Sequence, residues 1–140
     1  MGRLEEWGVQ VIVGVGVDVV EVDRLRRMRP AVFGRFMRRV LADGEVEYCL
    51  SRRDPYQCVA ARFAAKEAFV KALGLGDAWS VGFREVWVLG RPPRLSAVGR
   101  ALERLRELGV SRVHVSLSHT RGVAVAVVVL EGGGDDILGR

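Results

Sequence analysis

Valine occupies every second position of the segment 9–20, and this period of two predicts a β-strand there. The opposite face of the predicted strand carries Gly14, Gly16 and Asp18. Glycine weakens a strand interior and usually marks close approach by a ligand or by another stretch of backbone. The carboxylate of Asp18 lies on the same face. It either belongs to a site or caps the helix that we predict at 21–28.

Four later segments have the apolar spacing and the end signals of helices. The longest begins with Asp54 as an N-cap and Pro55 in its first turn, and Gly74 and Gly76 stop it. The last of the four is amphipathic and ends at Gly109. The predicted helices are 30–40, 43–50, 55–73 and 99–108.

Three more strands are predicted, at 84–89, 110–117 and 123–131. A turn at 90–93 follows the first of them, and a hairpin-like connection at 118–122 joins the other two. The final strand is apolar on both faces, which predicts a central position in its sheet.

This order of elements argues for α+β architecture, with a small, mostly antiparallel sheet packed on one long helix. The length of 140 residues is that of a single domain, which we expect to span 1–140. Residues 1–10 are expected to form an N-terminal extension, and residues 132–140 a loose tail.

Composition narrows the possible functions. Hydrophobic residues make up 49% of the chain and charged residues 28%, and no apolar run has the roughly 18–20 residues of a membrane span. With no signal-peptide pattern at the start, we expect a cytoplasmic protein. The formal net charge of +5 and the pI near 10.0 suggest an anionic partner, which nucleic acid, an acidic protein or a phosphorylated cofactor would each satisfy.

The two cysteines, Cys49 and Cys58, lack the C-x-x-C spacing and a secretory context, so we expect two free thiols. Only His114 and His119 could join them at a zinc ion, and these spacings match no familiar zinc site.

Both lysines of the chain, Lys66 and Lys71, lie in the longest predicted helix, while arginine carries all other side-chain positive charge. A compact ammonium group and a planar guanidinium are not interchangeable where a point charge meets a phosphate. Glu67 lies four residues before Lys71 and therefore shares its helical face. The alternative is an ordinary Glu–Lys helix pair, which contributes only a few tenths of a kcal/mol.

Asp18 and Glu67 are two carboxylates on separate elements, and two such ligands with room for phosphate oxygens and water commonly hold Mg²⁺. Lys71, one turn after Glu67, would then meet the same phosphates. The glycines before Asp18 do not form a dinucleotide-binding fingerprint, because Val19 stands where a third glycine is needed. The sequence also lacks a G-x-x-x-x-G-K phosphate-binding loop.

Two other clusters are candidates for binding. The hydroxyls and imidazole of the segment 116–120 would suit a phosphate, although they are equally typical of a turn. The pattern argues against a serine hydrolase, because Ser118 and His119, adjacent in a strand, are expected to point to opposite faces and no glycine elbow surrounds the serine. Arginines crowd the segment 24–29, either as a solvated face or as a docking surface for an acidic partner.

Taken together, these motifs resemble the holo-acyl-carrier-protein synthase family of small phosphopantetheinyl transferases. The likeness covers residues 11–131 and rests on three blocks in the family's order and spacing, with a Gly90-Arg-Pro92 turn that resembles the family's Gly-Lys-Pro. The blocks are Val13-Gly-Val-Gly-Val-Asp18-Val-Val-Glu-Val-Asp-Arg24, Ala61-Arg-Phe-Ala-Ala-Lys-Glu67-Ala-Phe-Val-Lys71-Ala-Leu-Gly-Leu-Gly76 and Val115-Ser-Leu-Ser-His119-Thr120.

The resemblance implies a reaction that moves 4′-phosphopantetheine from coenzyme A to a serine of an acyl carrier protein and leaves adenosine 3′,5′-bisphosphate. It implies that Asp18 and Glu67 bind Mg²⁺, that Lys71 holds a phosphate, and that Arg24 and Arg27 grip the acidic carrier. The coenzyme-binding set implied by the resemblance is Lys71, Gly74, Gly90, Pro92, His119 and Thr120. It further implies a homotrimer with sites between subunits.

Two features depart from the family's pattern. The chain begins about nine residues before the usual start, and the segment 40–45 matches the family's Leu-Thr-x-x-Glu only loosely. A small basic nucleic-acid-binding domain is the alternative function, favoured by the pI alone. Its tryptophans, Trp7, Trp79 and Trp87, are scattered along the sequence and are not gathered on one basic strand. The fatty-acid carrier and a polyketide or peptide-synthesis carrier remain open as the client.

Overall fold

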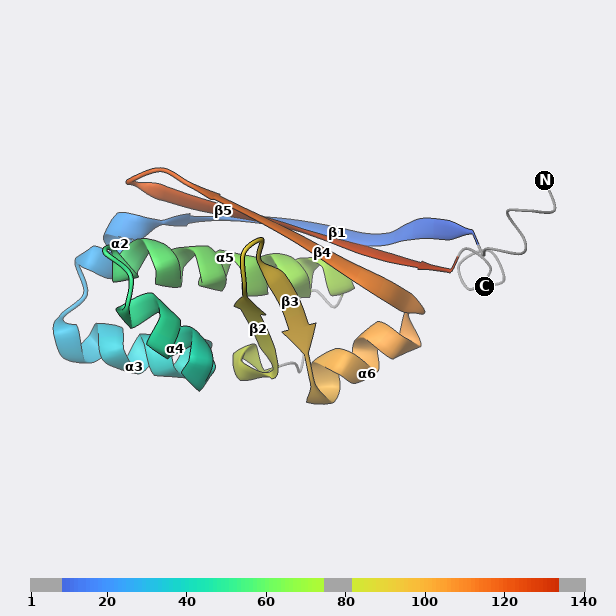
Figure 1. Ribbon diagram of the computed structural model, residues 1–140, viewed down its shortest axis with the longest axis horizontal. Coiled ribbons are helices and arrows are strands. Elements are labelled where there is room, and N and C mark those ends of the chain that lie inside the picture. The colour runs from blue at the N-terminus through green and yellow to red at the C-terminus, as the bar shows by residue number, and fades with distance from the viewer. Residues whose placement is uncertain (1–8, 75–81, 134–140) are drawn as a thin grey trace.

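A three-stranded antiparallel sheet covers one side of the longest helix in the computed structural model (Figure 1). The remaining helices and a two-stranded hairpin cover the other side, so the long helix lies between two layers. The structure describes residues 9–74 and 82–133. These features confirm the predicted α+β architecture with a small antiparallel sheet on one long helix.

The larger sheet has the strand order β1-β5-β4, with both neighbouring pairs antiparallel. Its strands are β1 (Gln10–Glu21), β4 (Val110–His119) and β5 (Val123–Gly133). The central position predicted for the last strand is confirmed. The side chains of β5 that face the long helix are fully buried, and they are Ala124, Ala126, Val128 and Leu130.

Five helices lie close to the predicted positions. They are α2 (Val22–Arg26), α3 (Pro30–Val40), α4 (Asp43–Leu50), α5 (Pro55–Leu73) and α6 (Gly99–Glu107). The predicted end signals of α5 are confirmed. The Asp54 side chain accepts a hydrogen bond from the backbone N–H of Gln57 at 3.3 Å, and Gly74 adopts the left-handed conformation with φ of 72°. Among the described residues, no helix is both long and apolar enough to cross a membrane.

The two glycines of β1 allow α5 to lie against the sheet. A Cβ atom at Gly14 would overlap the carbonyl oxygen of Ala72, and one at Gly16 would overlap that of Ala68. The sequence left open whether a ligand or a backbone approached this face. The structure identifies the backbone of α5, so these glycines bring the helix that carries Glu67 and Lys71 close to the strand that carries Asp18.

Gly16→Ala should therefore destabilise the protein by several kcal/mol, because the added methyl meets a backbone carbonyl that cannot move without shifting α5. Gly122→Ala is the matched control, since a Cβ there meets nothing within 4 Å. Urea unfolding of both variants tests this expectation. Equal midpoints for the two variants would show that α5 does not depend on this close approach.

The two-faced pattern predicted for the first strand holds for only part of its length. A β-bulge between Ile12 and Gly14 inserts one unpaired residue, which moves the side chains before it to the other face. Ile12 is therefore exposed and Val13 packs against the core, the reverse of the alternation in the sequence. After the bulge, Val15 and its outward-facing neighbours follow the predicted alternation.

The smaller sheet pairs β2 (Val86–Leu89) with β3 (Arg94–Ala97). The strand predicted at 84–89 begins two residues late, because η2 (Phe83–Glu85) precedes it, and β3 was not predicted. The predicted ends of the domain were also wrong in detail. Gln10 pairs with Gly133, so neither residue belongs to an extension or a tail. Gly76 and most of the predicted extension lie outside the described residues.

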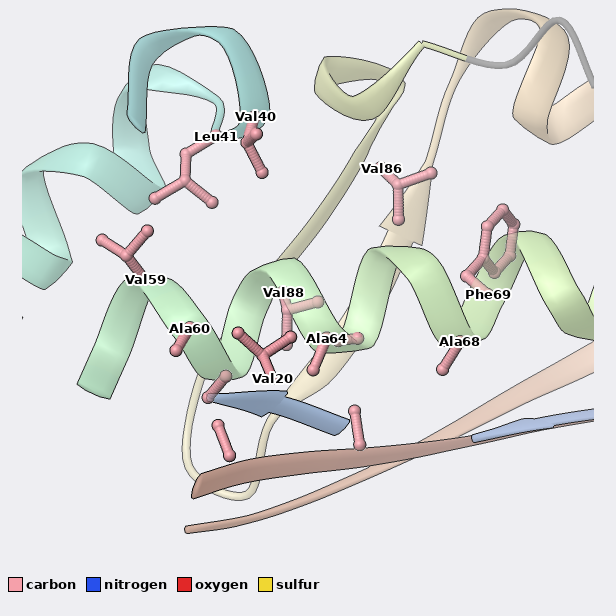
Figure 2. Packing of buried hydrophobic residues seen from close by; sticks show 14 of the residues in the cluster. Val20, Val40, Leu41, Val59, Ala60, Ala64, Ala68, Phe69, Val86 and Val88 are labelled. Carbon is pink, nitrogen blue, oxygen red and sulfur yellow. The ribbon is translucent and has the colours of Figure 1, made fainter. Parts of the chain in front are cut away.

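The core follows α5 along both of its buried sides (Figure 2). Small side chains, such as Ala64 and Ala68, face the large sheet, while larger ones, such as Val59 and Phe69, meet the second layer. This division explains the alanine-rich sequence of α5. Its sheet-facing side allows close packing, and its other side fills the space under α3, α4 and β2.

The prediction of two free thiols was wrong. Cys49, near the end of α4, and Cys58, in the early part of α5, form a disulfide. The chain reverses direction between these two helices, and this reversal brings the two residues together across a sequence separation of only 9. The sequence spacing carried no recognisable signal of it, since C-x₈-C is not a common redox or metal motif.

Candidate functional site

Asp18 and Lys71 meet between β1 and α5. The Lys71 Nζ atom lies 2.9 Å from Oδ1 of Asp18 and donates a second hydrogen bond to the carbonyl oxygen of Val17 at 3.0 Å. The Asp18 side chain is 18% exposed and that of Lys71 is 55% exposed, so the pair lies at the surface with its carboxylate partly sheltered. Asp18 does not cap the next helix, because the N-cap of α2 is Glu21.

Glu67 lies one turn before Lys71 and is half-buried. Burial raises the pKa of the Glu67 carboxyl, the negative charge of Asp18 raises it further, and Lys71 opposes both effects. The two carboxylates therefore lie close enough to repel each other. A divalent cation between them would remove this repulsion, so the donor pair fits Mg²⁺, which proteins commonly hold with one or two carboxylates and phosphate oxygens. The described residues contain no cluster of three or more histidine, cysteine, aspartate or glutamate side chains suited to a metal.

The other lysine of the segment, Lys66, is buried in an ion pair within the protein. It is 1% exposed and donates hydrogen bonds to Oε1 of Glu45 at 2.5 Å, to the carbonyl oxygen of Val40 at 2.8 Å and to that of Phe83 at 3.0 Å. Glu45, which is fully buried, also accepts from the N–H groups of Ala42 and Val88. This ion pair ties α5 to the second layer, away from Asp18.

A cavity of about 380 Å³ opens beside the first half of α5, and we call it the arginine cavity. Its lining comes from the end of α4, the loop after it, α5, the β2–β3 turn and the end of β4. The lining residues are Tyr48, Arg52, Arg53, Asp54, Gln57, Cys58, Ala61, Arg62, Gly90, Arg91, Pro93, Leu117 and His119. Four arginines and one aspartate give this cavity a positive charge.

Arg62 is the most deeply buried of the four arginines, at 6% exposed. Its Nε atom has no hydrogen-bond partner among the described residues, and its guanidinium lies 4.6 Å from the ring centre of Tyr48. A hydrogen bond from Arg91 to the hydroxyl lowers the pKa of Tyr48. A nearly buried arginine that lines a positively charged cavity is suited to binding an anion such as a phosphate.

The structure places the predicted coenzyme-binding residues in different environments. Gly90 and His119 line the arginine cavity, and Pro92 lies in the same turn between two lining residues. Thr120 shapes the turn after β4, where its hydroxyl accepts from the N–H of Val123 at 3.2 Å. Gly74 ends α5 at the opposite end from the cavity.

Asp18 and Glu67, which we call the acidic pair, lie on a different flank of α5 from the arginine cavity. Glu67 and Lys71 are on the flank beside β1, while Arg62 is on the flank beside β4, and β5 separates those two strands. Among the described residues, the cavity lining includes neither Asp18 nor Glu67. Within one chain, the proposed metal ligands and the proposed coenzyme cavity therefore do not form a single continuous site.

The arginines after β1 also differ in their surroundings. Arg26 bonds Asp54 at 2.7 Å and the carbonyl oxygen of Arg121 at 3.1 Å, so it holds α2 against the start of α5. Arg24, in the same short helix, and Arg27, its C-cap, are both exposed. Their exposure keeps them accessible to an acidic partner.

Sequence reasoning missed Arg62 and Tyr48 as candidate binding residues. Arg62 belongs to the same helix segment as the lysines, and the mismatch of a charged residue on a buried, alanine-rich face was a usable signal. Tyr48 had no such signal, because it joins the cavity only after α4 and α5 have packed together.

Comparison with protein families supports the predicted resemblance. Residues 14–128 match the model of the 4′-phosphopantetheinyl transferase superfamily. The chain is 45% identical over 123 residues to holo-[acyl-carrier-protein] synthase of Syntrophus aciditrophicus, covering 85% of this chain and 95% of the relative. It is 48% identical over 129 residues to the enzyme of that name from Anaeromyxobacter dehalogenans, covering 89% and 99% respectively.

Solved structures give the same result. The holo-[acyl-carrier-protein] synthase of Neisseria meningitidis superposes with a TM-score of 0.75 at 35% identity, over 86% of this chain and 98% of the other. A holo-(acyl-carrier-protein) synthase from Bacillus anthracis in complex with CoA (3′,5′-ADP) gives a TM-score of 0.68 at 32% identity, over 87% and 98%.

Proposed function

Because this chain belongs to the 4′-phosphopantetheinyl transferase superfamily, we infer that it is a holo-[acyl-carrier-protein] synthase. It transfers 4′-phosphopantetheine from coenzyme A to a serine of an apo acyl carrier protein and releases adenosine 3′,5′-bisphosphate. The observation that carries this conclusion is the identity of 42–48% to enzymes of that name over most of the chain. The alternative function, a nucleic-acid-binding domain, gains no support from these relatives.

Asp18 and Glu67 are proposed as the ligands of Mg²⁺. When bound, the ion would neutralise phosphate charge and polarise the phosphoryl centre. Transfer at a phosphoryl centre depends on positioning and charge neutralisation more than on covalent help from the protein. Lys71, whose exposed ammonium group lies beside Asp18, is proposed to hold a pyrophosphate oxygen of the coenzyme.

The arginine cavity is proposed to hold the anionic nucleotide part of coenzyme A. Arg62 would supply positive charge at the wall of the cavity, and His119 and Gly90 line the same space. Arg24 and Arg27 are proposed to contact the acidic surface of the carrier, since both are exposed, in α2 and at its C-cap, and α2 begins four residues after Asp18. We place this reaction in the cytoplasm, with the fatty-acid carrier and a polyketide or peptide-synthesis carrier both open as the client.

We also propose a homotrimer whose sites lie between subunits. The face of the large sheet turned away from α5 exposes valines, among them Val15 at 59%, Val17 at 52% and Val19 at 59%. An exposed apolar patch of this kind marks a protein interface. The separation of the acidic pair from the arginine cavity gives a second reason, because a neighbouring subunit would supply the missing half of each site.

Val17→Asp should convert the oligomer to monomers, because it places a charge in the centre of the apolar sheet face. Val98→Asp is the control. Val98 is also exposed, but it lies at the start of α6, where aspartate is a favourable N-cap. Light scattering after size exclusion measures the mass of each variant. A trimeric Val17→Asp protein, or a monomeric wild type, would contradict the assembly proposed here.

The activity itself is tested by mass spectrometry of an apo acyl carrier protein incubated with the chain, coenzyme A and Mg²⁺. We expect the carrier to gain one phosphopantetheine group, and to gain none when its acceptor serine is replaced by alanine. Parallel incubations with a fatty-acid carrier and a polyketide carrier compare the clients. An unmodified carrier in every incubation would rule out the proposed activity.

A further inference from the structure

The Cys49–Cys58 disulfide lies at the wall of the arginine cavity. Cys58 is a lining residue and is 9% exposed, whereas Cys49 is fully buried. Each cysteine lies beside one member of the stacked Tyr48–Arg62 pair, since Tyr48 precedes Cys49 directly and Arg62 follows Cys58 by one helical turn. The covalent bond therefore crosslinks the two helices that present this pair.

The disulfide also closes a short loop, 51–54, whose residues Arg52, Arg53 and Asp54 line the cavity. Arg52 and Arg53 of this loop line the cavity and are exposed to solvent, and the guanidinium of Arg52 lies 5.4 Å from the ring centre of Tyr48. Non-covalent anchors lie at the two ends of the loop. The Ser51 hydroxyl donates to the carbonyl oxygen of Tyr48 at 2.6 Å, and Asp54 bonds Arg26. The disulfide, which joins Cys49 before the loop to Cys58 after it, adds a covalent restraint.

We propose that this disulfide is a redox-sensitive latch on the coenzyme site. Oxidised, it holds the loop and the Tyr48–Arg62 pair in position to bind the nucleotide. Reduced, it frees the end of α4 and the loop after it from α5, although the Lys66–Glu45 ion pair still joins the two helices, and coenzyme binding weakens. This inference rests on the proposed function of the cavity. In a cytoplasmic protein, a disulfide is usually transient or redox-sensing, which agrees with a switch.

The chemistry is ordinary thiol–disulfide exchange. For reduction, a small thiolate enters the cavity, where the arginines attract it, and attacks Sγ of Cys58. Cys49 leaves as a thiolate and takes a proton, and a second thiolate of the reductant then releases Cys58. Oxidation reverses these steps. The two cysteine thiols lose two electrons and two protons, and a small-molecule disulfide such as oxidised glutathione is reduced to two thiols.

The test compares the wild type after treatment with oxidised glutathione and after treatment with dithiothreitol. Thiol alkylation followed by mass spectrometry establishes the redox state. Isothermal titration with adenosine 3′,5′-bisphosphate should give a Kd about tenfold higher for the reduced protein, because binding must then order the loop side chains. Adenosine 3′,5′-bisphosphate should also slow reduction by dithiothreitol, since it fills the route to Cys58. Cys49→Ala should show the weaker Kd with or without dithiothreitol.

Equal Kd values for the oxidised and reduced wild type would overturn the latch, as would two alkylated thiols after treatment with oxidised glutathione. These outcomes are separable from failure of the proposed function. Carrier modification with equal Kd values keeps the transferase and removes the latch. Absence of carrier modification, together with a redox-dependent Kd, removes the transferase and keeps the latch.

Discussion

Glu67→Gln is expected to lower the rate of carrier modification by on the order of 10²–10³-fold while leaving the protein folded. Glutamine keeps the size of the side chain but removes the negative charge that would pair with Asp18 around the cation. The loss should appear in kcat/KM at saturating Mg²⁺, measured by mass spectrometry of the carrier. Glu103→Gln, at an exposed position of α6, is the matched control and should retain full activity.

The same substitution should leave stability at neutral pH unchanged or increased. Burial and the charge of Asp18 raise the pKa of Glu67 in the folded protein. A carboxyl with a raised folded pKa contributes stability that is present below its ordinary pKa and is lost as the pH rises through the folded value. Glutamine mimics the protonated state, so the variant avoids this loss. Full activity, or a clear drop in Tm at neutral pH, would contradict the role given to Glu67.

The sequence predicted α5 closely, because the signals that bound this helix are local. Asp54, Pro55 and Gly74 act through their own backbone conformations and nearest neighbours, and these are fixed by residue type. The bulge at Ile12 and the strand β3 were beyond sequence reasoning, because both depend on a partner strand. A period-two pattern in the sequence does not reveal where a bulge moves the following or preceding side chains to the other face of the sheet.

In the candidate site, too, some residues could be identified from the sequence and others depend on how separate elements pack. Asp18 and Glu67 could be named as candidate ligands from the sequence, but their proximity could not, because the two glycines of β1 left open whether a ligand or a backbone approached that face. The arginine cavity could not be predicted either, because its lining comes from five separate elements. The disulfide shows most clearly what the sequence alone could not predict. Cys49 and Cys58 meet only after α4 and α5 have packed, and their spacing suggested two free thiols.

The two lysines are expected to differ in role: Lys66 stabilises the fold, and Lys71 is proposed to bind phosphate. Lys66→Met should destabilise the protein by about 3–5 kcal/mol, because it leaves the fully buried carboxylate of Glu45 without its cation. It also removes the donor from the carbonyl oxygens of Val40 and Phe83. Urea unfolding measures the loss, and the Glu45→Gln variant combined with Lys66→Met gives the coupling between the two side chains.

Lys71→Met is the matched comparison, only five residues further along the same helix. Lys71 is 55% exposed, so its ion pair with Asp18 contributes only about 0–1 kcal/mol to stability. We expect this variant to unfold near the wild-type urea midpoint and yet to lose carrier modification, because the proposed phosphate contact is gone. If Lys71→Met proved as unstable as Lys66→Met, the surface ion pair would be a structural element. If Lys66→Met kept the wild-type midpoint, the buried pair would not hold α5 to the second layer.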